Sequence, residues 1–384
     1  MHDVVVVGAG PAGLFAALRL ARAGYDVLVL EEHAAIGTPT HCTGVVSSEL
    51  QDLYKVPEDL VLHRATACSI VSPHGAVAEF RSHGEEIAVL DRAAFDRTLA
   101  AEAQQAGATI VCESRVEDLR VGRAATEVST GRHAHLARAV ILACGVGYRF
   151  HRQMDFGLPS RLLHTAQIEL DARPAESFEI HLGRQVAPEG FAWLVPVQRD
   201  GVSRVKAGVL LRGDARARLR TFLASPTVAS RLREAAGDPV LRLLPVALPR
   251  RTFGVRTLLV GDAAGLTKPI TGGGIFYSLL SAHLAAETLE EALALDDLGA
   301  QRLSRYEARW RQRLGRELRT GGWFRHLLAN FTDRELDTFV RAIDSEDVRA
   351  VIDRTARFNW HRSVILALVR QPGIKSMLLR SLFR

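Results

Sequence analysis

The sequence predicts an α/β fold in three parts: a parallel sheet with helices, an antiparallel sheet, and a helical C-terminal region. Three observations predict it. Short β-branched runs alternate with helical patterns near the N-terminus, residues 164–211 contain strands with alternating apolar positions, and apolar residues after 300 recur at helical spacing. A chain of 384 residues, 47% of them hydrophobic, can bury one large core or two intermingled cores.

Charge and cysteine content narrow the class of protein. The net charge is +6, but no basic stretch accompanies a nucleic-acid-binding motif, so we expect no nucleic-acid partner. The four cysteines show neither metal-ligand spacing nor a Cys-x-x-Cys pair, and no secretory signal is visible, which favours a cytoplasmic location. No apolar run approaches the roughly 18 residues of a membrane span.

The first parallel strand leads into a glycine-rich turn. Residues 4–7 are a continuous β-branched run, typical of a strand buried on both faces. Gly8, Gly10 and Gly13 form a G-x-G-x-x-G pattern, with Ala12 inside it. These glycines allow a tight turn, close approach of the backbone to a pyrophosphate, and close packing of the following helix on the sheet.

A second apolar run, residues 27–30, ends at Glu31, which lies 18 residues beyond Gly13. A carboxylate at the tip of the second strand can accept hydrogen bonds from ribose hydroxyls. A glycine-rich turn alone is a weak signal, but strand, helix, second strand and acid in register favour a dinucleotide site in a Rossmann-like domain.

A distant element decides which dinucleotide is expected. Residues 258–260 form another buried strand that runs into the segment GDAAG (261–265), and PITGGG (269–274) then opens a helix reaching about Leu295. NAD-dependent enzymes do not need this second element to bind their cofactor. The chain here resembles the FAD-dependent family that includes para-hydroxybenzoate hydroxylase and the geranylgeranyl reductases, which implies an FAD-binding Rossmann-like domain of the hydroxylase type.

The resemblance also implies roles for single residues. In such flavoproteins the acid at the position of Asp262 binds the ribityl chain. The helix N-terminus at Gly273, Gly274 and Ile275 faces the pyrimidine edge of the flavin. This placement has a physical reason, because reduced flavin carries negative charge near N1 and O2, and helix-end amides with their positive dipole stabilise that charge.

Two further residues are assigned to FAD by the same resemblance. Arg92 begins a predicted helix and matches the arginine that such flavoproteins place near the phosphates; the alternative is an ordinary surface arginine. Val116 follows the third strand, residues 109–112, and is expected to offer backbone contacts to adenine.

Missing motifs exclude some flavoenzymes. The chain has no second G-x-G-x-x-G unit and no C-x-x-x-x-C pair, which excludes the two-nucleotide disulfide reductases. The strand at 139–143 ends in Cys144-Gly145, where related hydroxylases carry an Asp-Gly pair that helps to position NADPH. This argues against an NADPH-driven hydroxylase, and the electron donor is left open between NADPH and a ferredoxin-like redox partner protein.

The segment IGTPTHCTG (36–44) resembles the G-x-P-x-x-C segment of geranylgeranyl reductases. In that family the cysteine lies beside the flavin ring, which implies that Cys42 and Thr43 contact FAD. Saturating an isolated alkene needs hydride at one carbon and a proton at the other, and a neutral thiol at Cys42 is a plausible proton donor. The alternative is a buried structural cysteine, our interpretation of Cys68, Cys112 and Cys144; His41 could share the proton-donor role.

The segment GFAWLVP (190–196) matches a second geranylgeranyl-reductase pattern except at Val195. Phe191 and Trp193 are two residues apart, so their rings face the same side of a strand. They are expected either to wall a prenyl-chain cavity or to be a plain core pair. Flavin halogenases carry tryptophan at both positions, so Phe191 argues mildly against halogenation.

The C-terminal tail is basic. After Asp353 no acid remains, whereas seven basic residues alternate with apolar ones: Arg354, Arg357, Arg362, Arg370, Lys375, Arg380 and Arg384. Two interpretations stay open: a basic amphipathic segment that contacts a membrane surface, and a helix pair packed on the protein body.

Together these patterns predict an FAD-dependent reductase that saturates carbon–carbon double bonds of a prenyl chain on an isoprenoid lipid, quinone or diphosphate. The alternatives are a flavin monooxygenase or halogenase, and an electron-transfer flavoprotein. The domains are expected to be FAD-binding (residues 1–62, 88–160 and 250–298), substrate-binding (63–87 and 161–249) and helical (299–384).

Overall fold

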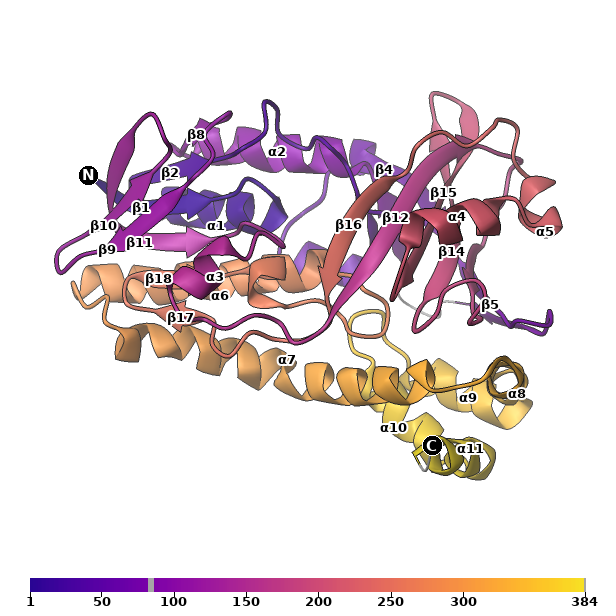
Figure 1. Cartoon of the computed structure of the whole chain (residues 1–384). Helices are drawn as coiled ribbons and strands as arrows, with labels where there is room; N and C mark the ends of the chain where they lie inside the picture. Colours follow the sequence, from indigo (N-terminus) through magenta and orange to yellow (C-terminus); the bar gives the residue numbers. More distant parts are fainter. Residues whose placement is uncertain (82–85, 383–384) are drawn as a thin grey trace.

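The computed structural model describes residues 1–81 and 86–382, and only the backbone of 379–382. Figure 1 shows an elongated molecule with a parallel sheet at one end and an antiparallel sheet at the other. The long helices α6 and α7 run beneath the parallel sheet toward the antiparallel end. Residues 82–85 of the predicted substrate domain and Arg384 of the basic tail lie outside the described residues.

The N-terminal sheet confirms the predicted parallel arrangement. Its parallel strands are, in sheet order, β18 (Thr257–Leu259), β11 (Ala134–Leu142), β1 (His2–Val7), β2 (Val27–Leu30) and β8 (Thr109–Val111). The antiparallel additions are β17 (Phe253–Gly254), β9 (Asp118–Val121) and β10 (Thr126–Ser129). Residues 4–7 of β1 are buried, as expected of a central parallel strand covered by helices on both faces.

Helices cover this sheet closely. They are α1 (Pro11–Arg22), α2 (Arg92–Gln105), the short α3 (Arg149–Gln153), α6 (Ile275–Ala294) and the first half of α7 (Ala300–Ala329). A methyl group on Gly13 of α1 would lie 2.0 Å from the Gly8 carbonyl oxygen, so this glycine lets the helix approach the strand. Helix α6 packs against α1 and ends at Ala294 with Leu295 as its C-cap, close to the end that the sequence predicts.

The second sheet confirms the predicted antiparallel region. Its order is β16 (Val240–Pro245), β12 (Leu162–Asp171), β15 (Val202–Leu211), β14 (Phe191–Arg199), β13 (Phe178–His181), β5 (Ala67–Val71) and β6 (Val77–Arg81). Only the β13–β5 pair is parallel among the described strands of this sheet. The Trp193 ring packs directly on Gly208, where a methyl group would lie 2.2 Å from the indole.

Smaller elements complete the middle of the chain. A three-stranded sheet joins β3 (Val45–Ser47), β7 (Ile87–Leu90) and β4 (Val61–Ala65). Helices α4 (Ala215–Leu223) and α5 (Pro226–Ala229) follow β15, and short 3-10 turns occur at Ser48–Asp52, Glu58–Leu60 and Gly261–Ala264.

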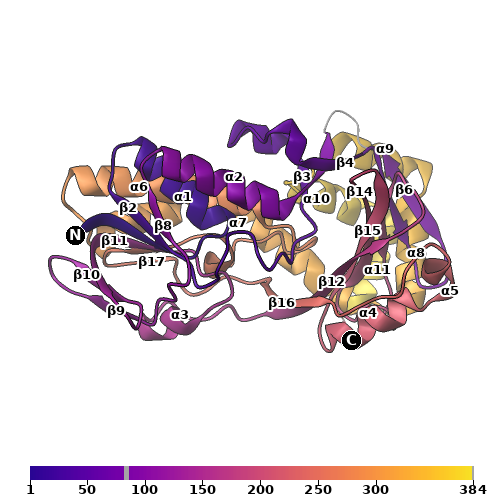
Figure 2. The same ribbon diagram turned by 90° about the horizontal axis from the view of Figure 1, so that it is seen from above.

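The C-terminal region is helical, as predicted. After α7 come α8 (Asp333–Ile343), α9 (Glu346–Thr355), α10 (Arg362–Arg370) and α11 (Pro372–Leu382). Figures 1 and 2 show these helices at the same end of the molecule as the antiparallel sheet. Their apolar faces form a cluster that includes Phe324, Phe331 and Phe339. Among the described residues, none of the helices is long and apolar enough to cross a bilayer.

Candidate active site

One large cavity connects the two ends of the molecule. It has a volume of about 1090 Å³ and reaches from the turn after β1, past β14 and β16, to the helices α7–α10. All the site residues that the sequence predicts lie on its wall except Gly13, which packs α1 on β1 instead. The structure thus gathers residues that are more than 200 positions apart in the chain, such as Glu31 and Asp262.

The glycine turn presents open backbone to the cavity. Gly8 has a φ of +102°, and a methyl group there would lie 2.6 Å from the Ala143 carbonyl oxygen, so only glycine fits. In contrast, a methyl group on Gly10 would meet no atom within 4 Å. Gly10 is also the N-cap residue of α1, and no side chain there accepts a hydrogen bond from the first amides of the helix. The turn therefore leaves room and amide donors for a phosphate group at the helix N-terminus.

Glu31 is held at the end of β2 by backbone amides. The Ala9 N–H donates to Glu31 Oε2 at 2.7 Å, and the His33 N–H donates to Oε1 at 2.9 Å. Val116 lines the same part of the cavity, and the Ser114 N–H donates to the Glu31 carbonyl oxygen at 2.8 Å. Glu31 and Val116 thus lie on one part of the cavity wall, the part where the sequence predicts the adenosine group.

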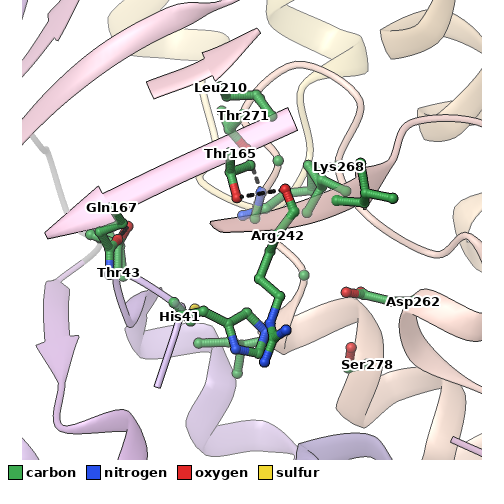
Figure 3. Close-up of a pocket in the computed structure, with 18 of the residues that line it drawn as sticks. His41, Thr43, Thr165, Gln167, Leu210, Arg242, Asp262, Lys268, Thr271 and Ser278 are labelled. Carbon is green, nitrogen blue, oxygen red and sulfur yellow. Dashed lines mark hydrogen bonds between the residues drawn. The ribbon is translucent and has the colours of Figure 1, made fainter. Parts of the chain in front are cut away.

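Asp262 lies on the wall at the start of the second motif. Figure 3 shows its carboxylate near Ser278, on the side of the cavity opposite the antiparallel sheet. Within the described part of the chain, no hydrogen bond reaches this carboxylate, and burial raises its pKa to about 6 although Arg92 opposes the shift. A half-buried carboxylate that accepts no hydrogen bond from a described residue fits a position that receives ligand hydroxyls.

The loop after Asp262 leads to the N-terminus of α6. Gly273, Gly274 and Ile275 all line the cavity, and Gly274 is the N-cap with no side-chain cap. The first amides of α6 are therefore left for a ligand, at the positive end of the helix dipole.

Arg92 is buried rather than exposed, which excludes the surface alternative. Its side chain is 11% exposed, and Nη2 donates to both carboxylate oxygens of Asp96 at 3.0 Å. Burial lowers the pKa of Arg92, but the neighbouring Asp96 and Cys42 raise it more, so the net shift is upward. Arg92 Nε is buried and has no hydrogen-bond partner among the described residues.

The antiparallel sheet fixes the Cys42 loop. Thr43 Oγ1 donates to Gln167 Oε1 at 2.7 Å. Lys206 Nζ donates to the carbonyl oxygens of Thr43 at 2.8 Å and Leu90 at 3.3 Å. Burial lowers the pKa of Lys206 to about 8. Two side chains from β12 and β15 therefore set the position of the loop that carries Cys42.

Other titratable groups share the cavity wall with Cys42. Figure 3 shows His41 beside Arg242, and loss of hydration together with Arg242 lowers the pKa of His41 to about 4. Cys68 and Cys144 also line the cavity, and burial raises the pKa of each to about 12. At neutral pH these three groups are uncharged. Cys112 does not line the cavity.

Phe191 and Trp193 face the same side of β14, as predicted. Their ring centroids are 5.9 Å apart, and both side chains line the cavity. Beyond them the wall is formed by apolar residues of the C-terminal helices: Phe324, Leu328, Phe331, Leu336, Phe339, Ile343, Ile352, Val364, Ile365 and Leu368. The cavity is therefore polar at the glycine turn and apolar at the helical end.

Sequence reasoning missed several wall residues: Gln167, Arg242, Lys268, Phe358 and the apolar helical residues. It also missed Lys206 behind the Cys42 loop. Lys206 and Lys268 could have been recognised from the sequence, because the chain has only four lysines and these two interrupt otherwise apolar or glycine-rich segments. Lys206 and Lys268 are both buried, with exposures of 3%. Buried lysines are rare unless they are paired or functional.

The residues present fit FAD. An open glycine turn, an amide-held carboxylate at Glu31, a buried unpaired Arg92 Nε and a carboxylate without hydrogen bonds at Asp262 line one cavity. The uncapped α6 N-terminus completes this set. Each of these groups matches one part of the dinucleotide: pyrophosphate, ribose, ribityl chain or pyrimidine edge.

Comparison with known proteins agrees with this assignment. The sequence pattern described as FAD dependent oxidoreductase matches residues 3–68 and 61–278. The chain is 33% identical to digeranylgeranylglycerophospholipid reductase 2 of Methanopyrus kandleri, over 91% of this chain and 92% of the relative. It is 36% identical to digeranylgeranylglycerophospholipid reductase 1 of the same organism, over 81% and 86% of the two chains.

Solved structures show the same fold. A geranylgeranyl bacteriochlorophyll reductase-like protein from Thermoplasma acidophilum superimposes with a TM-score of 0.86 at 23% identity, covering 99% of each chain. The halogenase PltM, solved with phloroglucinol and FAD, superimposes with a TM-score of 0.70 at 16% identity, covering 99% of this chain and 90% of the halogenase. The reductase-like fold is thus the better match of the two.

Proposed function

The chain belongs to the FAD-dependent oxidoreductases and, among them, to the digeranylgeranylglycerophospholipid reductase family, and from this premise we propose that it saturates carbon–carbon double bonds in the prenyl chain of an isoprenoid lipid. The continuous cavity carries the proposal, because it joins the residues that fit FAD to an apolar space between the C-terminal helices. A largely apolar cavity suits a prenyl chain better than it suits a polar aromatic substrate.

Cys42 is the proposed proton donor. When bound and reduced, FAD supplies the hydride that one alkene carbon receives. The other carbon needs a proton, and the Cys42 thiol lies on the same cavity wall. The adjacent Arg92 guanidinium would stabilise the thiolate that remains after proton transfer. His41 is neutral at pH 7 and is therefore a poor acid.

A pair of cysteine variants tests this role. Cys42→Ser should keep FAD but slow the anaerobic oxidation of photoreduced protein by a prenyl lipid about 100-fold, the lower end of what general acid catalysis contributes. Cys112→Ser is the matched control, because Cys112 lies outside the cavity wall, and it should react at the wild-type rate. Equal rates in wild type and Cys42→Ser would remove Cys42 from the reaction.

The basic tail is proposed to bring the cavity to a membrane surface. Arg354, Arg357, Arg370 and Lys375 are exposed, whereas Val364 and Ile365 of the intervening helix line the cavity. Basic residues on the same segment as part of the apolar cavity wall suit an enzyme that takes lipid from an anionic leaflet, at about 1 kcal/mol per basic residue near the surface.

Surface charge variants test this contact better than truncation does. Removing residues after 353 would also remove Asn359, whose backbone and side chain bond Tyr277 and Lys268. Changing the four exposed tail residues to Glu should abolish co-sedimentation with vesicles containing anionic lipid. The control changes four exposed arginines at the other end: Arg22, Arg120, Arg123 and Arg132. Equal binding by both variants would contradict tail contact.

A further inference from the structure

Lys268 lies in the loop that leads to the N-terminus of α6. Its N–H donates to the Gly273 carbonyl oxygen at 3.0 Å, and its carbonyl oxygen accepts from the Gly272 N–H at 2.9 Å. The side chain packs over the same glycines, since a methyl group on Gly273 would lie 2.7 Å from Lys268 Cε and 3.1 Å from Nζ. The ammonium group is therefore in contact with the loop at the positive end of α6.

The connection between α9 and α10 holds this ammonium group in place. Lys268 Nζ donates to Asn359 Oδ1 at 3.1 Å and to the Phe358 carbonyl oxygen at 3.2 Å, and it lies 4.0 Å from the Phe358 ring centroid. Figure 3 places Lys268 on the cavity wall near Thr271.

Asn359 is in turn fixed from three other elements. Its Nδ2 donates to Ser47 Oγ at 3.1 Å and Glu49 Oε2 at 2.9 Å, and its carbonyl oxygen accepts from the Tyr277 hydroxyl at 2.9 Å. Asn359 is only 1% exposed. The lysine side chain is thus held by buried and part-buried hydrogen bonds, and its charge cannot move away from the loop without breaking them.

A positive charge at this position adds to the α6 dipole. The cavity wall at Gly273 and Gly274 is the part that fits the pyrimidine edge of FAD, where negative charge gathers on reduction. In a poorly hydrated site, a fixed charge acts more strongly than it does in water. We propose that Lys268 stabilises reduced FAD relative to oxidised FAD, and that the C-terminal region, through Asn359, thereby sets the reduction potential. This goes beyond the proposed reaction and holds for any lipid substrate.

The midpoint potential of the bound flavin tests the proposal. Lys268→Met and Lys268→Gln should each make reduction at least tenfold less favourable, which is about 30 mV for a two-electron couple. Asn359→Ala should shift the potential in the same direction by less, because the charge stays but loses its anchor. Lys375→Met, which removes an exposed lysine on α11, is the matched control and should leave the potential unchanged.

Binding affinities separate a charge effect from a loss of structure. The ratio of the FAD dissociation constants in the oxidised and reduced states must change by the same factor as the reduction equilibrium. Weakened binding in the reduced state alone would support the proposal. An unchanged potential in both Lys268 variants, or equal weakening of FAD in the two redox states, would overturn it. If Lys268→Met does not fold, Lys268→Gln and Asn359→Ala supply the same comparison.

Discussion

The two ends of the cavity are built by different rules. At the glycine turn, the requirement falls on the backbone: Gly8 needs a positive φ, and Gly13 needs space for the Gly8 carbonyl oxygen. At the helical end, Phe331, Phe339 and Leu368 need only to be apolar and of suitable size. Backbone requirements select one residue type, whereas packing accepts several. The glycine turn can therefore be predicted from the sequence, whereas the helical end of the cavity cannot.

The strongest way to test this contrast is a pair of glycine variants. Gly13→Ala should destabilise the FAD-free protein by about 3 kcal/mol or more, because the new methyl group would lie 2.0 Å from a backbone oxygen that cannot easily move. Urea unfolding of the FAD-free protein measures this. Gly10→Ala is the matched change, since its methyl group would meet nothing within 4 Å.

Gly10→Ala should therefore keep its stability within about 1 kcal/mol but lose FAD affinity, if a pyrophosphate approaches this backbone. Equal stability of the two variants would show that α1 can shift away from β1. It would also mean that Gly13 is not required for packing.

Glu31→Ala tests the next largest effect at the same end. Loss of a charged hydrogen bond should weaken FAD binding by about 1–3 kcal/mol, since the carboxylate is already oriented by Ala9 and His33. Fluorescence titration of the FAD-free protein measures the dissociation constant. The control is Glu117→Ala, an exposed carboxylate outside the cavity wall, and this variant should bind FAD as wild type does. Unchanged affinity in Glu31→Ala would remove this residue from the ribose site.

At the helical end, a larger side chain on the cavity wall should weaken binding of the lipid substrate and leave FAD binding unchanged. Val364→Phe adds volume to the wall in α10 and should raise KM for a prenyl lipid about tenfold, equivalent to roughly 1.4 kcal/mol. FAD affinity should not change, because Val364 belongs to the part of the wall that α10 forms and not to the glycine turn. Ser363→Phe, an exposed neighbour on the same helix, is the control. A variant that weakens FAD instead would mean that the two ends are not separate.

The same contrast explains what the sequence could predict. The strands near the glycine turn, the α6 start and the Phe191–Trp193 pair follow from local patterns. The structure confirms the pair, and it places these strands within two residues of the predicted bounds. Lys206 and Lys268 were missed because their partners, Thr43 and Asn359, lie 163 and 91 positions away in the chain. No local pattern encodes such contacts. The helical wall was missed for the reason already given, since apolar residues at helical spacing equally predict an ordinary core.

The smallest expected effect concerns His41, which lies beside Arg242 on the wall. Although His41 is exposed at its place on the cavity wall, the surrounding protein removes part of its hydration, and this effect together with Arg242 lowers its pKa from 6.5 to about 4 in the folded protein. The unfolded chain therefore binds more protons than the folded protein between these two pH values, so stability falls as pH decreases from 6.5 toward 4.

His41→Gln cannot take up this proton. Its Tm should match that of wild type at pH 7.5 to within a few degrees, and should fall less than the wild-type Tm when the pH is lowered to 5. His133→Gln, an exposed histidine outside the cavity, is the control and should follow wild type at both pH values. If His41→Gln loses as much stability as wild type on acidification, then His41 is as well hydrated as a surface histidine, and the cavity wall beside Arg242 is wetter than an apolar prenyl site requires.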